Sequence, residues 1–321
     1  MIGSRRPTRP LGAAAIAALL CLLCLAAGCG TPGSARSGAP KTASSAPGGG
    51  TGGTAGTGGQ GTARVLYAGS LVNVMERDVG PAFAAATGDR YRGYGAGSAQ
   101  VANEIKGGIR PGDLFISADP SVNATLEGAR GGHFVSWYAS FARSPLVLGY
   151  NPRSRFAAQL KSRPWYDVAS EPGFRLGRTD PKLDPKGMLT ARAIKETAAE
   201  QHLPVLAGRI LRNSAVFPEE ELAGRLQAGQ LDAGFFYAVE TSDLGVPSVS
   251  LRPIDLGATY TLTVLDKAPD RIAGVAFAAY LLGPHGRAIL RHHGFTVTKP
   301  ALHGPAAAVP ARLRPLVGAG G

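Results

Sequence analysis

Two short segments repeat one local design: a strand-like run, small residues, a serine and then a helix-like run. They are Ala68-Gly69-Ser70-Leu71 and Gly95-Ala96-Gly97-Ser98, and we call them the serine turns. A helix N-terminus leaves backbone N–H groups unpaired and carries partial positive charge, while glycine lets a ligand approach the backbone closely. Ser70 and Ser98 add hydroxyl donors, so the pair predicts a site for a small anion. Each serine alone is also explained as an ordinary helix N-cap.

Three further segments carry polar side chains that could face the same site. Asp184 stands ahead of a predicted helix within the polar stretch Thr179–Gly187, and Glu219-Glu220-Glu221 opens another helix. Tyr237 ends an apolar strand, where a tyrosine hydroxyl can reach a cleft. Each also has a plain structural explanation, as an N-cap, as acids in a first helical turn, or as a core tyrosine.

Hydrolytic chemistry is the main alternative for a serine that follows a strand. The nucleophile elbow G-x-S-x-G needs a glycine two residues before and two after the serine. Ala96 and Gln100 occupy those positions around Ser98, and the surroundings of Ser70 fail in the same way. None of the six histidines stands near an acid at a spacing that suggests a triad, and no phosphate-binding G-x-x-x-x-G-K-[ST] loop is present.

The N-terminal region predicts export and lipid attachment. Three arginines precede the apolar run Leu11–Ala27, and small residues then lead to Gly28-Cys29. This order is typical of a signal peptide over residues 1–28. A cysteine directly after the small residues indicates a lipobox, in which Cys29 is lipidated and becomes the first residue of the mature chain. An uncleaved membrane anchor is the alternative, and Arg5-Arg6 leaves the Sec and twin-arginine routes both open.

Composition limits the function of the mature chain. No cysteine follows Cys29, which excludes a disulfide, a thiolate metal site and a cysteine nucleophile. Residues 29–62 consist almost entirely of Gly, Ser, Thr, Ala and Pro after the cysteine and predict a flexible linker. The formal charge of +12 falls to +9 without the three signal arginines, which suits an anionic partner. The basic residues are scattered, so nucleic acid is not expected.

Beyond the linker, strand-like and helix-like segments alternate, which predicts an α/β fold with parallel sheets. The strand-like segments are Arg64–Ala68, Tyr91–Gly95, Asp113–Ser117, Ser144–Asn151, Phe174–Arg178, Asp232–Tyr237 and Tyr260–Asp266. The helix-like segments are a run over Val72–Phe83 interrupted at Pro81, then Ala99–Lys106, Pro120–Arg130, Gly187–Gln201, Glu219–Gln227, Arg271–Leu282 and Pro284–His293. The tail from Pro300 shows no periodicity, and we expect it to be poorly ordered.

Taken in order, these pieces resemble the substrate-binding proteins of molybdate and tungstate ABC importers, most closely the tungstate/molybdate-binding branch. The resemblance spans roughly Arg64 to Phe295. It is carried by Tyr67-Ala68-Gly69-Ser70-Leu71, Gly97-Ser98, Asp113–Asp119, Trp137-Tyr138, Phe141-Ala142-Arg143, Leu146–Tyr150, Asp184-Pro185-Lys186-Gly187 and Phe236-Tyr237.

The resemblance implies a type II periplasmic-binding-protein fold, with two α/β lobes joined by a two-strand hinge that close over the ligand. The first lobe would comprise residues 63–142 plus 260–300 and the second residues 143–259, with residues 301–321 as a C-terminal tail. Ser144–Asn151 and Tyr260–Asp266 would be the crossing strands.

The resemblance also implies roles for the site residues. Ser70 and Ser98 would donate hydrogen bonds to the oxyanion, and Tyr237 matches the family's ligand-contacting tyrosine. Asp184 matches an aspartate that approaches the metal centre of the oxyanion. Its partner glutamate falls in Glu219-Glu220-Glu221, where Glu220 aligns best and Glu219 next. Lys186 stands where the family often has cysteine or a small residue.

The resulting prediction is an extracytoplasmic, lipid-anchored, monomeric binding protein for molybdate or tungstate. It would deliver the oxyanion to an ABC permease, and it would need no cofactor, no catalysis and no metal other than the Mo or W centre. Two alternatives remain open: a binding protein for sulfate, phosphate or another small anion, and an extracellular hydrolase.

Overall fold

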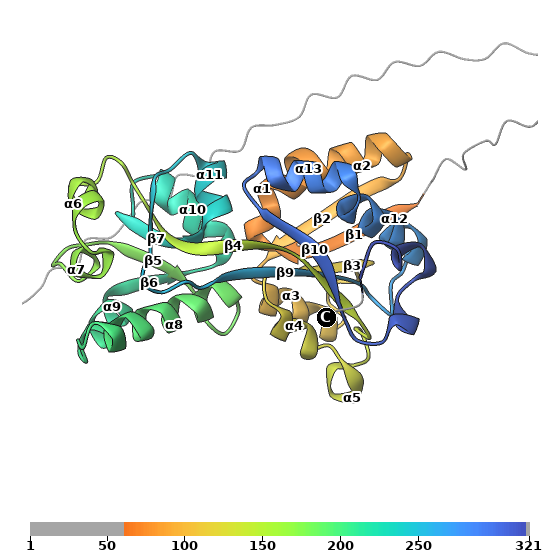
Figure 1. Ribbon diagram of the computed structural model, residues 1–321, viewed down its shortest axis with the longest axis horizontal. Helices are drawn as coiled ribbons and strands as arrows, with labels where there is room; N and C mark the ends of the chain where they lie inside the picture. Colours follow the sequence, from red (N-terminus) through yellow and green to blue (C-terminus); the bar gives the residue numbers. More distant parts are fainter. Residues whose placement is uncertain (1–60, 319–321) are drawn as a thin grey trace, which may run out of the picture. The chain divides into compact units, whose positions relative to one another are not determined.

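Two long strands connect the two halves of the chain. The computed structural model describes residues 61–318, so the predicted signal peptide, Cys29 and almost all of the linker lie outside the described residues. Strand β4 (Tyr138–Tyr150) pairs with β9 (Gly257–Val264) and β10 (Thr296–His303) over its first part. Over its second part it pairs with β7 (Ala233–Tyr237) and β8 (Ser248–Ser250). Figure 1 shows β4 and β9 running side by side between two groups of elements.

The first lobe is built around a parallel core. Strand β1 pairs in parallel with both β2 and β3, and β9 continues the sheet antiparallel to β3. Its strands are β1 (Thr62–Ala68), β2 (Arg90–Ala96), β3 (Leu114–Ser117) and β10 (Thr296–His303). Its helical segments are η1 (Gly69–Leu71), α1 (Val72–Val74), η2 (Met75–Val79), α2 (Gly80–Thr87), α3 (Ser98–Lys106), α4 (Pro120–Ala124), α5 (Gly128–Gly131), α12 (Arg271–Leu282), α13 (Pro284–His292), η3 (Ala306–Ala308) and η4 (Ala311–Leu313).

The second lobe repeats the parallel arrangement. Strand β5 pairs in parallel with β6 and β7, and β7 joins the sheet to β4. Its strands are β5 (Leu176–Thr179), β6 (Ser214–Phe217), β7 (Ala233–Tyr237) and β8 (Ser248–Ser250). Its helices are α6 (Ala157–Ser162), α7 (Trp165–Ala169), α8 (Pro185–Glu200), α9 (Leu206–Asn213), α10 (Glu219–Gln227) and α11 (Ala238–Leu244).

The predicted alternation of strands and helices is confirmed, with one helix divided. The sequence analysis did not predict strands β6, β8 and β10 or helices α6, α7, α9 and α11. The segment Pro120–Arg130 forms two short helices, α4 and α5, and not a single one. Gly128, the first residue of α5, has φ at +56°. This left-handed conformation prevents one continuous right-handed helix from running through α4 and α5. The expected interruption near Pro81 appears as the π-helical segment η2, which ends directly before Gly80-Pro81.

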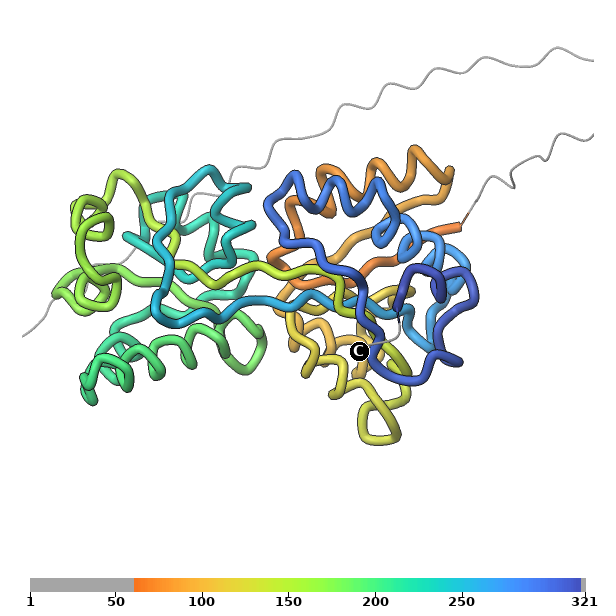
Figure 2. The backbone as a smooth tube through the Cα atoms, viewed as in Figure 1, coloured from red at the N-terminus to blue at the C-terminus, as the bar shows by residue number. Residues whose placement is uncertain are grey.

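The C-terminal tail differs from the expectation of poor order, which was wrong for the described part. Strand β10 pairs with β4 through Ala301, Leu302 and His303, and Figure 2 shows the C-terminal segment lying against the first lobe. Val309 and Leu313 are buried, and η4 packs against α12. Apolar burial on a completed lobe fixes this segment, although prolines break any regular helix pattern in its sequence.

None of the helices within residues 61–318 combines the length and apolar character needed to cross a membrane.

Burial of the tail predicts a measurable stability contribution. Leu313 is 0% exposed, so Leu313→Ala should lower the free energy of unfolding by about 2–5 kcal/mol through lost packing. The neighbouring Arg312 is exposed, and Arg312→Ala should change it by no more than about 0.5 kcal/mol. Urea unfolding of both variants measures this difference. Equal stabilities would contradict a packed tail.

Candidate binding site between the two lobes

The two serine turns lie side by side at one edge of the first lobe. Ala68 of β1 pairs in register with Ala96 of β2, and each strand then leads through glycine and serine into a helix. The N-terminal N–H groups of two helix starts therefore gather at the carboxyl ends of adjacent parallel strands. This is the arrangement that the sequence predicted, and it favours an anion.

The first serine turn is occupied by a carboxylate from the second lobe. Gly69 N and Ser70 N donate to the two carboxylate oxygens of Glu219 at 2.9 and 3.1 Å. A Cβ on Gly69 would lie 2.6 Å from a Glu219 oxygen, so only glycine permits this approach. The Ser70 Oγ accepts a hydrogen bond of 3.1 Å from the Tyr260 hydroxyl. The carboxylate of Glu219 thus takes the part of an anion at this turn.

The second serine turn meets a loop of the second lobe. The fully buried Ser98 accepts a hydrogen bond of 3.1 Å at Oγ from Ala118 N. Gln100 N donates to the Leu183 carbonyl at 3.0 Å, and a Cβ on Gly97 would lie 2.5 Å from that carbonyl oxygen. The two lobes are therefore in direct contact at both serine turns.

The second lobe presents its own carboxyl edge to the serine turns. Thr179 at the end of β5 pairs in register with Phe217 at the end of β6, and β7 ends nearby at Tyr237. The loops that follow these parallel strands carry Asp184 and Glu219. Ligands of parallel α/β sheets bind at the carboxyl ends of the strands. In this protein the carboxyl ends of both lobes face each other across one interface.

Asp184 is a buried N-cap with one free oxygen. Its Oδ1 accepts a hydrogen bond of 3.0 Å from Lys186 N at the start of α8. Its Oδ2 is buried without a partner among the described residues, as are the Thr179 hydroxyl and the Tyr237 hydroxyl. Burial raises the pKa of Asp184, although the charge of Lys186 opposes the rise. Buried polar atoms without partners mark positions that a polar ligand can satisfy.

The two candidate glutamates have different environments. Glu219, the first residue of α10, is 6% exposed, and its pKa is raised to about 8 by burial and by the charge of Asp184. Glu220 aligns best with the family pattern, but it is exposed. The structure therefore brings Ser70, Glu219, Asp184 and the Tyr237 strand end into one interface, with Glu220 at its border.

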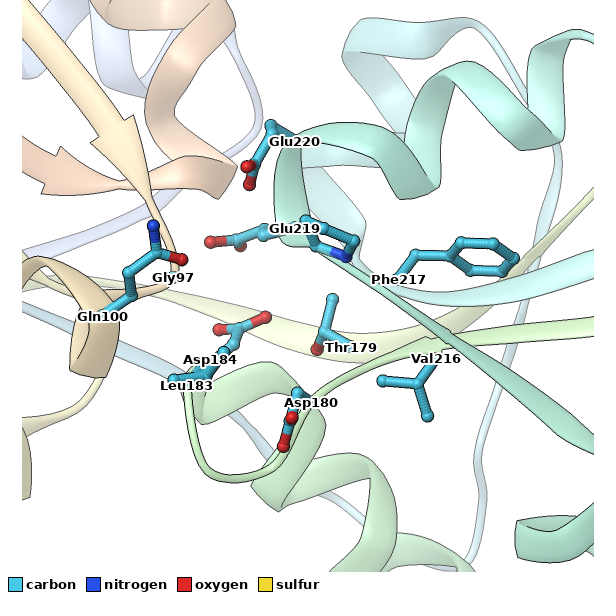
Figure 3. Close-up of a pocket in the computed structure, with 11 residues that line it drawn as sticks. Gly97, Gln100, Thr179, Asp180, Leu183, Asp184, Val216, Phe217, Glu219 and Glu220 are labelled. Atoms are coloured by element: carbon cyan, nitrogen blue, oxygen red, sulfur yellow. The ribbon is translucent and has the colours of Figure 1, made fainter.

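Two cavities flank the Glu219 side chain. One of about 310 Å³ is lined by Gly97, Gln100, Thr179, Asp184 and both candidate glutamates, among others. Figure 3 shows the carboxylates of Asp184 and Glu219 directed into this cavity, with Gln100 of α3 across from them. The other cavity, of about 330 Å³, is lined by Ser70, Arg77 and the same two glutamates.

Three residues of this site were missed by sequence reasoning. Tyr260 was assigned only to a strand, yet its hydroxyl contacts Ser70. Lys186 is fully buried, and its Nζ donates to Glu219 at 3.1 Å and to Glu240 at 2.7 Å. Glu240 follows Tyr237 by three residues and accepts from its backbone N–H, which is a capping-box signal.

A third inter-lobe contact involves Asp243, which lines the second cavity together with Ser70. His293, which follows α13, contacts Asp243 of α11 at 2.7 Å through Nδ1 and Asp78 of η2 at 3.0 Å through Nε2. One imidazole thus connects a carboxylate of each lobe.

Two α/β lobes that meet at their carboxyl edges and are joined by two long strands define a class of proteins that close over a small ligand. The chain belongs to the bacterial extracellular solute-binding protein family, whose model matches residues 63–296. Members of this family are non-enzymatic components of transport, and this chain is accordingly an extracellular solute-binding protein.

Individual relatives agree with this assignment. A Haloferax volcanii protein named as a candidate ABC transporter molybdenum-binding protein is 31% identical over 223 residues, covering 69% of this chain and 67% of the relative. The molybdate/tungstate-binding protein of Thermococcus kodakarensis is 22% identical over 281 residues, covering 71% of this chain and 78% of the relative.

A solved structure confirms the expected periplasmic-binding fold. The periplasmic molybdate-binding protein of Azotobacter vinelandii superposes with a TM-score of 0.58 at 17% identity, covering 74% of this chain and 99% of that chain.

The raised pKa of Glu219 predicts a pH dependence of stability. Because the folded-state pKa of about 8 lies above the ordinary value of 4.5, the folded chain retains a proton that the unfolded chain releases between these values. The contribution of Glu219 is full below pH 4.5 and is lost as the pH rises through about 8. We expect the unfolding free energy of Glu219→Gln to fall less steeply than that of the wild type over this range.

The matched control for this measurement is Glu220→Gln, which removes a carboxylate from the exposed neighbouring position. Denaturant unfolding at several pH values compares the three proteins. Equal slopes for the two variants would show that burial of Glu219 does not control the pH dependence.

Proposed function

We propose that this protein captures molybdate or tungstate between its lobes and delivers it to a membrane permease. Ser70 and Ser98 donate to the oxo groups, Tyr237 contributes its hydroxyl, and Asp184 and a glutamate of α10 approach the metal centre. The lobes comprise residues 63–142 plus 260–300 and residues 143–259, and closure over the oxyanion creates the surface that the permease recognises.

The observation that carries this proposal is the combination of two opposite chemistries at one interface. The first lobe offers backbone N–H groups at Gly69 and Ser70, which suit the oxygens of an anion. The second lobe offers the unpartnered Oδ2 of Asp184, which would repel those oxygens. A ligand with oxo groups on one side and a metal that accepts a carboxylate on the other makes use of both groups at once.

This combination also explains selectivity. Sulfate has no coordination position open at its central atom and no proton to donate, so a nearby carboxylate only repels it. Phosphate also has no open position at its central atom and can meet a carboxylate only through its own hydroxyl. Molybdate and tungstate can expand their coordination, and the same carboxylate then becomes a ligand. A carboxylate that binds one anion and repels its analogues produces a large difference between their affinities for the site. The names of the relatives from Haloferax volcanii and Thermococcus kodakarensis support this ligand class.

Glu219 and Glu220 are the two candidates for the second carboxylate. Glu219 is buried and reaches the first serine turn, whereas Glu220 is exposed and lines both cavities. We favour Glu219 because its carboxylate already lies against the donors that would hold the oxyanion. The resemblance favours Glu220, so both are tested.

A hydrolytic role has no support in the described part of the chain. The hydroxyl of Ser70 pairs with Tyr260 and that of Ser98 with the backbone of Ala118, and no described hydrogen bond joins either serine to a histidine. A serine nucleophile needs an adjacent base.

We also propose that the chain is exported, lipidated at Cys29 and held to the membrane as a monomer through its linker. The basic start, the apolar run and the small residues before Cys29 support this. The anchor would keep the binding lobes close to the permease.

Calorimetric titration with tungstate, molybdate, sulfate and phosphate tests the ligand. We expect one-to-one binding of tungstate or molybdate. Asp184→Asn should weaken that binding at least about tenfold, or about 1.4 kcal/mol, because a bond to the metal centre is lost. Its affinity for sulfate should not fall in parallel. Glu219→Gln should act like Asp184→Asn, and Glu220→Gln should have the smaller effect.

Absence of binding with all four anions would overturn the proposal. Equal affinity for tungstate and sulfate in the wild type would point to a general anion receptor. A larger loss in Glu220→Gln than in Glu219→Gln would assign the metal-contacting role to Glu220.

Fractionation of cells tests the anchor. Replacement of Cys29→Ser should move the protein from the membrane fraction to the soluble or secreted fraction, because no lipid can be attached. Cys24→Ser, inside the predicted signal, is the matched control and should leave the protein in the membrane fraction. Membrane retention of both variants would favour an uncleaved anchor.

A further inference from the structure

We propose that Lys186 determines the charge preference of the site: its ammonium group allows a carboxylate-rich edge to accept a doubly charged oxyanion. This inference rests on the proposed function and adds to it a specificity-determining residue. The side chain of Lys186 is 0% exposed, which is unusual for lysine unless it is paired with acids.

The contacts of Lys186 place it at the centre of the charged groups of the second lobe. Its Nζ lies 3.1 Å from Glu219 and 2.7 Å from Glu240. The other oxygen of Glu240 accepts from Tyr237 N at 2.7 Å. Lys186 follows Asp184 by two residues and donates its backbone N–H to that carboxylate. One cation thus connects the first turns of α8, α10 and α11 to one another.

The charge balance shows why this cation is needed. Asp184, Glu219 and Glu240 bring three carboxylates to one buried region, and the ammonium of Lys186 pairs with Glu219 and Glu240 there. Burial alone would lower the pKa of Lys186, but these carboxylates raise it, so the ammonium stays charged. Without it, a dianion would approach three uncompensated acids in a region of low dielectric, where like charges repel strongly.

Lys186 also fixes the direction of Glu219. The ammonium and the two backbone N–H groups of Gly69 and Ser70 bind the same carboxylate. An incoming oxyanion takes over the N–H donors of Gly69 and Ser70, and Glu219 can turn from them toward the metal centre while keeping its contact with Lys186. Lys186 therefore keeps the Glu219 carboxylate paired after that carboxylate has left the backbone N–H donors.

Four proteins test this role: the wild type, Lys186→Met, Lys182→Met and the double variant Lys186→Met/Glu240→Gln. Methionine keeps most of the length of lysine without its charge. Lys182 is exposed in the same loop, and its backbone N–H, not its ammonium, contacts Asp180. Lys182→Met therefore removes an equal charge outside the buried cluster.

The affinity for tungstate and molybdate is measured by calorimetry at about pH 6 and about pH 8. We expect Lys186→Met to weaken binding about 100-fold or more at the higher pH, because breaking a buried pair leaves uncompensated charge. The loss should be smaller at the lower pH, where the acids take up protons. Lys182→Met should change affinity less than about threefold. The double variant should regain about tenfold of the loss, because it removes one acid with the cation.

The outcomes separate this inference from the proposed function. A wild type that binds no oxyanion overturns both. A wild type that binds while Lys186→Met binds equally well at both pH values overturns the inference alone. A loss that is the same at both pH values, and that the double variant does not relieve, assigns Lys186 a structural role and also overturns it.

A folding failure of Lys186→Met would not stop the test. The double variant is matched in charge to the wild type, and Glu240→Gln alone removes one acid while the lysine remains. We expect Glu240→Gln to bind the oxyanions about tenfold more tightly than the wild type. Unchanged or weaker binding by Glu240→Gln would then contradict the inference.

Discussion

The contact between the Glu219 carboxylate and the backbone of the first serine turn is the interaction on which the arrangement of the site depends. It joins a helix start of each lobe, and it satisfies N–H groups that would otherwise remain unpaired in a buried place. It also requires Gly69, because any side chain there would collide with the carboxylate. The protein thus places its own carboxyl group where the sequence predicts an external anion.

The Glu219 carboxyl group at the first serine turn affects the affinity for a ligand. An oxyanion that enters the site replaces one anion by another at the same donors, so only the difference between the two interactions contributes to binding. The contacts of His293 with Asp243 and Asp78 also hold the lobes together. Binding free energy is therefore a balance between ligand contacts, displaced carboxylate and lobe contacts, and it cannot be read from the ligand contacts alone.

The serine turns and most strands were predictable because each is a local pattern of a few residues. The choice between Glu219 and Glu220 was not. Neighbouring residues on a helix differ in direction by about 100°, and the direction that faces the site is set by the other lobe. The burial of Lys186 was equally hidden, since its partner Glu240 lies 54 residues away. In the tail, prolines obscured a four-residue spacing of aliphatic side chains, such as Val309 and Leu313, which are buried against the first lobe.

The sheet order has a consequence for how the chain reaches this structure. Strand β9 lies between β3 and β4, so the centre of the first lobe stays open until residues 257–264 are available. The second lobe is a continuous stretch between β4 and β9 and can complete its parallel pairs earlier during synthesis or export. The pairing of Pro145 with Gly257 closes a long loop, which makes the first lobe the slow, high-contact-order step. We therefore expect the half that carries both serine turns to form last.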